Sequence, residues 1–296
     1  MPNFGISERT ILSYFTPGTE LCCDGRKCTV VEADKPTCQN GEPKTDIFVR
    51  LRTETECNDI KISYKQENAD FLENKIDAQR AKQLFGRNWR HIIQESTGSI
   101  KNQFYHRDLI YKESYGKTRK GSITLGWKFE LVNKEGGLSG LLKLSRQQLY
   151  DVYAGTNLSP DKKNAIINGR VIANSGVAEY ILNVDCINSA QDAIDKMIPI
   201  NQYIQVYPNI YFACKALNYR TFENRYDGDR PLAVQVQWSI RNGKLTRDLI
   251  FNTPLENNGT KMAERLMQCL RRLGIQTTDN INSSNTDMSS VNIFGQ

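Results

Sequence analysis

The chain has 296 residues, of which 39% are hydrophobic and 24% charged, and its formal net charge is +6. This composition supplies a core and excludes an intrinsically disordered chain. No apolar run approaches the ~20 residues of a membrane-spanning helix, and the first residues lack the basic and apolar segments of a signal peptide. We therefore expect a globular, cytoplasmic protein that does not associate with membranes.

Histidine is scarce, and this excludes several mechanisms. The chain has two histidines, His91 and His106, so a His-rich metal site or a His-based metallonuclease lacks its ligands. No Gly-x-Ser-x-Gly nucleophile elbow is present. Five of the eight cysteines lie between residues 22 and 57 but form no Cys-x-x-Cys pair, so we expect free thiols rather than a zinc site. A single Ser or Cys nucleophile with one His base stays open, but we expect any hydrolytic chemistry to use carboxylates and lysines.

Charge changes along the chain. Residues 1–60 hold 7 Lys and Arg against 10 Asp and Glu, residues 61–170 hold 20 against 11, and residues 171–296 hold 12 of each. A basic segment beside a mildly acidic one is typical of a phosphate-binding surface next to a carboxylate cluster. A lysine-rich solvated surface produces the same pattern, so charge alone does not decide for nucleic acid.

The N-terminal part of the chain alternates between predicted helices and strands. Ser7 caps a predicted helix over residues 7–15. Three segments are then predicted as strands: residues 28–32, 46–51 and 59–65. In the third of them, apolar even-numbered residues face one way and polar odd-numbered residues face the other. A second helix is predicted over residues 69–85.

The C-terminal part mixes helices and strands after a basic, glycine-containing loop over residues 111–126. Helices are predicted over residues 145–153 and 260–273. Asn242-Gly243 is a strong type I′ turn signal, and it predicts a hairpin between the two apolar segments on either side of it, residues 232–241 and 244–251. The tail from residue 277 is rich in Asn and Ser, and we expect it to be disordered or loosely attached.

The residues that point to chemistry lie on the second and third predicted strands. One strand opens with Asp46 and the next ends with Lys65, so both side chains reach the same end of a sheet if the strands are neighbours. Phosphodiester hydrolysis without histidine needs such a pair. A carboxylate holds Mg²⁺, which activates water, and a lysine positions the water or stabilises the developing negative charge.

Two short segments carry a family resemblance. Lys44-Thr45-Asp46-Ile47 and Ile62-Ser63-Tyr64-Lys65 resemble the two half-motifs of the PD-(D/E)xK phosphodiesterase superfamily, the fold of most type II restriction endonucleases. The resemblance covers residues 7–85, in the order helix, three strands, helix. It implies an α/β (α+β) restriction-endonuclease-like core, with a mixed central sheet flanked by helices. It further implies a Mg²⁺-dependent endonuclease that acts on double-stranded DNA as a homodimer.

The resemblance also implies roles for individual residues. Asp46 would bind the metal and Lys65 would orient the attacking water. The family usually has Asp or Glu two residues before the lysine, where this chain has Ser63, so another acid must complete the site. We prefer Glu67, on the face of Lys65 if the strand continues, and Glu20 from the N-terminal region. The other acids we consider are Asp59, Glu42 and Glu8. The predicted catalytic set is Asp46, Lys65, Ser63 and Glu67.

The basic loop is the predicted DNA contact. Glycines let the backbone approach phosphates, and Tyr111 and Tyr115 are interleaved with four cations: Lys112, Lys117, Arg119 and Lys120. A mobile, solvated loop has the same composition. We assign the catalytic core to residues 1–126 and the outer strands, dimer contacts and DNA recognition to residues 127–276. Residues 277–296 would form the flexible tail.

Two other functions stay open from the sequence. The chain could be a nuclease-fold protein that binds DNA but has lost catalysis, with Ser63 marking the loss. It could also be a structural or interaction protein whose basic surface contacts an acidic partner. The first alternative predicts DNA binding with a steep salt dependence, and the second predicts no affinity for nucleic acid at moderate salt.

Overall fold

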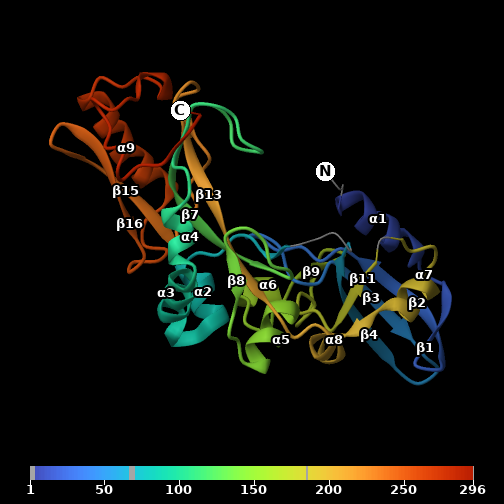
Figure 1. Ribbon diagram of the computed structural model, residues 1–296. Helices are drawn as coiled ribbons and strands as arrows, with labels where there is room; N and C mark the ends of the chain where they lie inside the picture. The colour runs from blue at the N-terminus through green and yellow to red at the C-terminus, as the bar shows by residue number, and fades with distance from the viewer. Residues whose placement is uncertain (1–3, 67–70, 185, 296) are drawn as a thin grey trace. The chain divides into compact units, whose positions relative to one another are not determined.

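The protein is described by a computed structural model that covers residues 4–66, 71–184 and 186–295 (Figure 1). The chain forms two compact units. Unit 1 comprises Met1–Asp70 and Leu144–Asn209, and unit 2 comprises Phe71–Lys143 and Ile210–Gln296. Both combine helices with sheets, which confirms the predicted mixed α/β (α+β) fold class with sheets flanked by helices. None of the described helices has the length and apolar character needed to cross a membrane.

Unit 1 is built on a mixed sheet with the strand order β1-β2-β3-β4-β11-β12. Its strands are β1 (Glu20–Cys23), β2 (Arg26–Asp34), β3 (Ile47–Arg52), β4 (Cys57–Lys65), β11 (Tyr180–Asn183) and β12 (Ile198–Pro199). Neighbouring strands are antiparallel except for β11, which runs parallel to β4. The three predicted strands correspond to β2, β3 and β4, and β1 extends the sheet beyond them.

One face of this sheet carries the core of unit 1. The alternation of β4 places Ile60, Ile62 and Tyr64 in that core. Two helices contribute to the same cluster: α1 (Phe4–Tyr14) through Ile11, and α7 (Ala190–Lys196) through Ala193 and Ile194. Each large aliphatic side chain buried in this way contributes about 1.5–3 kcal/mol to folding. The remaining elements of the second segment are α5 (Arg146–Ala154), α6 (Pro160–Lys163), β9 (Ile166–Ile167), β10 (Arg170–Val171) and α8 (Ile200–Val206).

Unit 2 is built around two long antiparallel strands, β7 (Ser122–Val132) and β13 (Tyr211–Arg220). The sheet has the central order β14-β13-β7-β15-β16, and four short strands pair with β7, β13 or each other. In the central order, β14 is Arg225–Tyr226, β15 is Val234–Arg241 and β16 is Lys244–Ile250. The four short strands are β5 (Phe71–Glu73), β6 (Ile110–Tyr111), β8 (Ser139–Leu141) and β17 (Ile293–Phe294). The helices are α2 (Ala78–Phe85), α3 (Trp89–Ser99), α4 (Lys101–Tyr105) and α9 (Gly259–Arg272), with 3-10 turns at Gly86–Asn88 and Thr278–Asn280.

The predicted hairpin is confirmed in unit 2. β15 and β16 pair antiparallel, and the turn residues Asn242 and Gly243 both have positive φ angles, 51° and 74°. A type I′ turn requires this left-handed backbone at both central positions, and Asn and Gly adopt it most readily. The helices predicted over residues 145–153 and 260–273 correspond to α5 and α9.

The chain divides differently from the predicted domains. Residue 126 lies inside β7, a single continuous strand, so it is not a boundary. The chain leaves unit 1 at residue 70 and returns at residue 144, where it later supplies β11 to the unit 1 sheet. The predicted assignment of residues 1–126 and 127–276 to two regions therefore does not match either unit, because the pairing of β4 with β11 joins segments that are far apart in sequence.

Two further predictions require correction. The helix expected over residues 69–85 is shorter: α2 begins at Ala78, where the Asp77 side chain accepts the Arg80 N–H, and Phe71–Glu73 instead pairs with β7. The tail from residue 277 is ordered rather than disordered. Thr278, Ile281 and Thr286 are fully buried, and β17 pairs with β6. The Asn and Ser side chains of the tail are used in local hydrogen bonds.

Candidate active site

Several strands of unit 1 reach one end of the sheet together. β2 ends at Asp34, opposite Phe48 near the start of β3, and β4 ends at Lys65, opposite Asn183 at the end of β11. The Asp46 N–H donates to the Ile62 carbonyl at 2.9 Å, which fixes Asp46 immediately before β3 and beside β4. This end of the sheet is called the strand-end site below, and it comprises Glu8, Lys35, Asp46, Ser63 and Lys65.

Asp46 and Lys65 come together at the strand-end site. The Lys65 Nζ lies 3.6 Å from Asp46 Oδ2, and both side chains are partly buried. The same oxygen accepts the Tyr64 N–H at 2.8 Å and the Ser63 hydroxyl at 3.2 Å. Among the described residues, no hydrogen bond of this carboxylate involves Oδ1. Oδ2 is therefore held by two hydrogen bonds and an ion pair, whereas Oδ1 can face a cation or a water.

Ser63 occupies the position where the resembling family has an acid. Its side chain is 2% exposed, and it lies on the opposite face of β4 from the Ile60, Ile62 and Tyr64 cluster. Its hydroxyl acts as a hydrogen-bond donor to Asp46. A hydroxyl brings no negative charge, so the site has one carboxylate fewer than the family pattern implies.

Glu8 is the acid from the N-terminal helix that lies near Asp46. It forms an ion pair with Lys35, which follows β2 at the same end of the sheet, and its side chain is 15% exposed. Burial raises the pKa of Glu8 and the charge of Asp46 adds to the rise, while Lys35 and Lys65 act in the opposite direction. Burial alone would lower the pKa of Lys35, but its hydrogen bond to Glu8 and the charges of Glu8 and Asp46 outweigh this, so the pKa is raised.

Of the two acids preferred from the sequence, the structure describes only Glu20. Glu20 pairs with Lys27 at 2.9 Å on the exposed strand β1. It stands opposite Thr29, which stands opposite Arg52 at the far end of β3. The antiparallel register therefore places Glu20 at the other end of the sheet from Asp46, and its predicted metal-binding role with Asp46 is wrong. Glu67 lies outside the described residues.

The carboxylates of the strand-end site could supply some, but not all, of the ligands of a hard cation such as Mg²⁺. Mg²⁺ in proteins is usually held by one or two carboxylates together with waters and substrate phosphate oxygens, and Asp46 with Glu8 would meet that need. In residues 4–66, 71–184 and 186–295, no three His, Cys, Asp or Glu side chains are grouped in a way that would hold a metal ion. The residues therefore fit a metal that shares its ligands with a bound phosphate, and not a closed protein cage.

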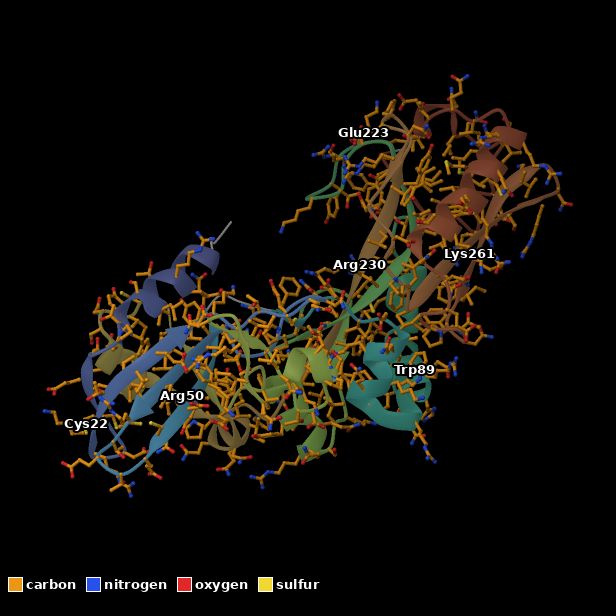
Figure 2. The ribbon with its side chains drawn as sticks, turned by 180° about the vertical axis from the view of Figure 1, so that it is seen from behind. Cys22, Arg50, Trp89, Glu223, Arg230 and Lys261 are labelled. Carbon is orange, nitrogen blue, oxygen red and sulfur yellow. The ribbon has the colours of Figure 1, made fainter. Side chains whose placement is uncertain are left out.

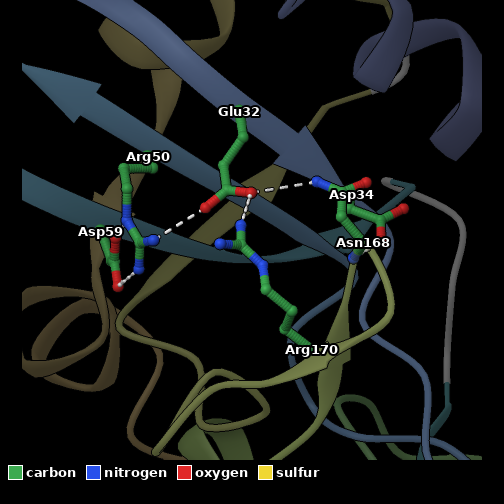
Figure 3. Close-up of polar contacts among 6 residues, drawn as sticks. All are labelled: Glu32, Asp34, Arg50, Asp59, Asn168 and Arg170. Atoms are coloured by element: carbon green, nitrogen blue, oxygen red, sulfur yellow. Dashed lines mark hydrogen bonds and ion pairs between the residues drawn. The ribbon is translucent and has the colours of Figure 1, made fainter.

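A polar network on the same face of the sheet was not predicted from the sequence (Figure 3). Arg50 binds Asp59 through two nitrogens at 2.7 and 2.9 Å and Glu32 through a third at 2.7 Å. Arg170 also reaches Glu32 at 2.7 Å, and the Asn168 N–H donates to Asp34 at 2.6 Å. The network ties the β9–β10 hairpin to the sheet beside the strand-end site. An arginine among the apolar residues of β3 was the available signal.

The predicted DNA-contacting cations all lie in unit 2. Arg119 pairs at 3.2 Å with Glu223, the residue labelled in Figure 2, and Lys120 pairs with Asp279 at 3.2 Å. Lys112 and Lys117 form no ion pair with any residue that the structure describes. In the sequence of unit 1 there are 14 Lys and Arg against 18 Asp and Glu. In that of unit 2 there are 25 Lys and Arg against 15 Asp and Glu. The positive charge of the chain therefore belongs to unit 2.

The two units thus offer different chemistry. The strand-end site pairs a partly shielded carboxylate with an ammonium group, which is the arrangement that a metal-assisted attack on a phosphate ester needs. Unit 2 offers an excess of cations suited to a polyanion. No protein-family model matches the chain, and no curated protein or solved structure is significantly similar to it.

Proposed function

We propose that the chain is a Mg²⁺-dependent endonuclease that hydrolyses phosphodiester bonds in double-stranded DNA, of the type II restriction kind. The observation that supports this most directly is the placement of Lys65 Nζ 3.6 Å from Asp46 Oδ2 at the strand-end site. The mixed sheet in which β11 runs parallel to β4 is in keeping with the resemblance to the PD-(D/E)xK superfamily. Such an enzyme would act in the cytoplasm.

Each residue of the strand-end site has a role in this proposal. Asp46, held through Oδ2 by Ser63 and the Tyr64 N–H, would present Oδ1 to the metal. When bound, Mg²⁺ supplies a Lewis acid that polarises the scissile phosphate and lowers the pKa of water. Lys65 would orient the attacking water by hydrogen bonding and offset the charge that develops on the phosphate oxygens. Glu8 would provide a second carboxylate from α1.

Cutting both strands of a duplex imposes a further requirement. Two strands of a palindromic site are related by a two-fold axis, so two copies of the chain would each present one strand-end site. We therefore include a homodimer in the proposal. The cations of unit 2 would bind the DNA phosphates and hold the duplex, since phosphate contacts position a protein on DNA without specifying its sequence.

A second candidate function is DNA binding without cleavage, and the observation in its favour is Ser63. The position carries a buried hydroxyl that donates to Asp46, where the family has a metal-binding acid. If Glu8 remained paired with Lys35, a single carboxylate would face the metal. The protein would then bind DNA through unit 2 and leave it intact.

The test is incubation of the purified full chain with unmethylated phage DNA and Mg²⁺, alongside three variants. We expect discrete fragments from the wild type and from Glu20→Gln, a matched control at the other end of the same sheet. We expect none from Asp46→Asn or Lys65→Ala. Cutting by Asp46→Asn at the wild-type rate would refute the site assignment. Intact DNA in every reaction, with Mn²⁺ as well as Mg²⁺, together with salt-dependent binding, would favour the second candidate.

A further inference from the structure

Unit 2 contains a pocket that the proposed cleavage chemistry does not use. Its volume is about 310 Å³, at the lower end of the ~300–1,000 Å³ range of small-molecule sites. The lining residues that matter here are Arg107, Tyr111, Tyr115, Lys117, Thr124 and Trp127. All belong to unit 2. Arg107 follows α4, Tyr111 lies on β6, and the others come from the loop between β6 and β7 or from β7 itself. The pocket is referred to below as the loop pocket.

The loop pocket combines an apolar floor with aromatic walls. Trp127 lies on β7 opposite Ala216 of β13, and both line the pocket with the buried Cys214. Trp127 is buried, whereas Tyr115 is 60% exposed at the outer edge. Flat rings around an apolar floor bind a flat ring well, because stacking requires only that both partners have a π face.

The outer wall is held in place by the C-terminal residues. Phe294 of β17 packs against Tyr115 with ring centroids 4.8 Å apart and against Tyr111 at 6.0 Å. The N–H groups of Tyr115 and Thr118 each donate to the other's carbonyl at 2.9 Å, and Gly116 between them has a φ of 55°. A wall ordered before binding lowers the entropic cost of receiving a ligand.

Polar groups of the loop pocket are placed for a base and its flanking phosphates. Arg107 and Lys117 line the pocket, and within the described residues neither forms an ion pair. Asp108 also lines the pocket. Burial raises the pKa of Tyr111, and the negative charge of Asp108 raises it further. The Thr124 hydroxyl donates to Asn218 at 3.2 Å. A carboxylate and a hydroxyl can bond the polar edge of a base, while the two cations suit phosphates on either side of it.

We infer that the loop pocket receives a single nucleobase displaced from the stack of bound DNA. This inference rests on the proposed function, and it adds that unit 2 examines one extruded base before unit 1 cuts. Aromatic walls, an apolar floor and a few edge-directed polar groups are what enzymes that read a flipped base provide. A free nucleotide presents the same base and phosphate, so the test separates it from a base within DNA.

The experiment compares a fully paired duplex with the same duplex carrying one unpaired nucleotide, with each of the four bases in turn. An unpaired base costs less to extrude, so we expect the wild type to bind at least one of the unpaired duplexes more tightly. Tyr115→Ala should weaken that binding by about 5- to 150-fold and leave binding of the paired duplex nearly unchanged. The matched control is Tyr207→Ala in unit 1, which removes a tyrosine that is 51% exposed and also packs on one ring, Tyr203, at 4.7 Å.

The outcomes separate this inference from the proposed function. Equal affinity of the wild type for paired and unpaired duplexes would overturn the inference, and so would a preference that survives Tyr115→Ala. Free mononucleotides that bind the pocket as tightly as the unpaired duplex would also overturn it. If the preference is present and depends on Tyr115 but no DNA is cleaved, the inference holds and the proposed function fails. If DNA is cleaved without any preference, the proposed function holds and the inference fails.

Discussion

Unit 1 and unit 2 differ most in charge. Unit 1 has 14 Lys and Arg against 18 Asp and Glu, and unit 2 has 25 against 15. The basic segment of residues 61–170 includes parts of both units. A charge count along the sequence therefore separates basic from acidic residues less clearly than a count by unit does. The acidic unit carries the candidate chemistry and the basic unit carries the candidate DNA contacts. Attraction of a polyanion and retention of a metal are therefore assigned to separate parts of the chain.

In each unit, a strand from a distant part of the sequence pairs parallel with an earlier strand. In unit 1, β11 pairs parallel with β4 from a segment more than a hundred residues further along. In unit 2, β17 pairs parallel with β6 from the end of the described chain. Each pairing closes a long loop, which costs entropy that the buried contacts must offset. Each also places its new strand beside a proposed site.

The largest expected effect separates the two units by function. Asp46→Asn removes the negative charge of Asp46 from the strand-end site, and we expect the cleavage rate to fall by at least about 10²–10³-fold, the loss typical for one key electrostatic group. Unit 2 is untouched, so DNA affinity without metal should equal or exceed that of the wild type. Cleavage assays and binding measurements on the same preparation check this. A matching loss of affinity would show that chemistry and binding are not divided between the units.

The next effect concerns the ordered tail of unit 2. Ile281 is 0% exposed, so Ile281→Ala should reduce the free energy of unfolding by about 2–5 kcal/mol. The matched control is Ile198→Ala on β12 of unit 1, where the side chain is 37% exposed and the loss should be much smaller. Urea unfolding of both variants measures the difference. Equal losses would show that the tail does not pack as described.

A smaller effect tests where DNA phosphates bind. Lys112→Ala combined with Lys117→Ala should weaken DNA binding about equally for all sequences. If both lysines contact phosphates, the slope of log affinity against log salt should fall by about 2 in magnitude. The double variant Arg26→Ala with Lys27→Ala makes the same charge change in unit 1 and should leave the slope unchanged. A larger change in that control would place the phosphate contacts in the acidic unit.

The sequence predicted local features well and distant ones poorly. Strand β4 follows from alternation, and β2 and β3 follow from short β-like segments bounded by turns. The approach of Asp46 to Lys65 follows from the short connection between β3 and β4, which makes them antiparallel neighbours. The Asn242-Gly243 turn is equally local. β11 was missed because nothing near residues 180–183 indicates a partner at residues 62–65. The approach of Glu8 to Asp46 was not predicted, because it depends on how α1 packs on the sheet.

The tail shows a different limit of sequence interpretation. Its Asn, Ser and Thr content is that of a disordered segment, yet the same side chains satisfy backbone groups in tight turns. Asn280, for example, accepts the Thr277 N–H at 3.0 Å. Composition indicates how much apolar surface a segment can bury. It does not indicate whether a few residues, such as Ile281, are buried against the rest of the protein. The tail is joined to segments far away in the sequence: the Leu245 N–H of β16 donates to the Asn285 carbonyl at 2.8 Å, and β17 pairs with β6.

The smallest expected effect is the pH dependence that Glu8 gives to unit 1. Burial is the main cause that raises the pKa of Glu8 above its usual 4.5. The folded chain therefore binds this proton more tightly than the unfolded chain does. Its contribution to stability is fully present below pH 4.5 and is lost as the pH rises through the raised value. Glu8→Gln has no ionisable group at position 8. It should therefore gain stability relative to the wild type as the pH rises through the raised pKa of Glu8.

Urea unfolding of the wild type and Glu8→Gln at a series of pH values measures this difference. A cation at the strand-end site would favour the ionised carboxylate, so Mg²⁺ should reduce the pH dependence of the wild type and leave Glu8→Gln unaffected. A difference between the two proteins that ignores Mg²⁺ would leave Glu8 as the partner of Lys35 alone. Asp46 would then be the sole carboxylate of the described site, and the metal would depend on the phosphate oxygens of the DNA that unit 2 holds.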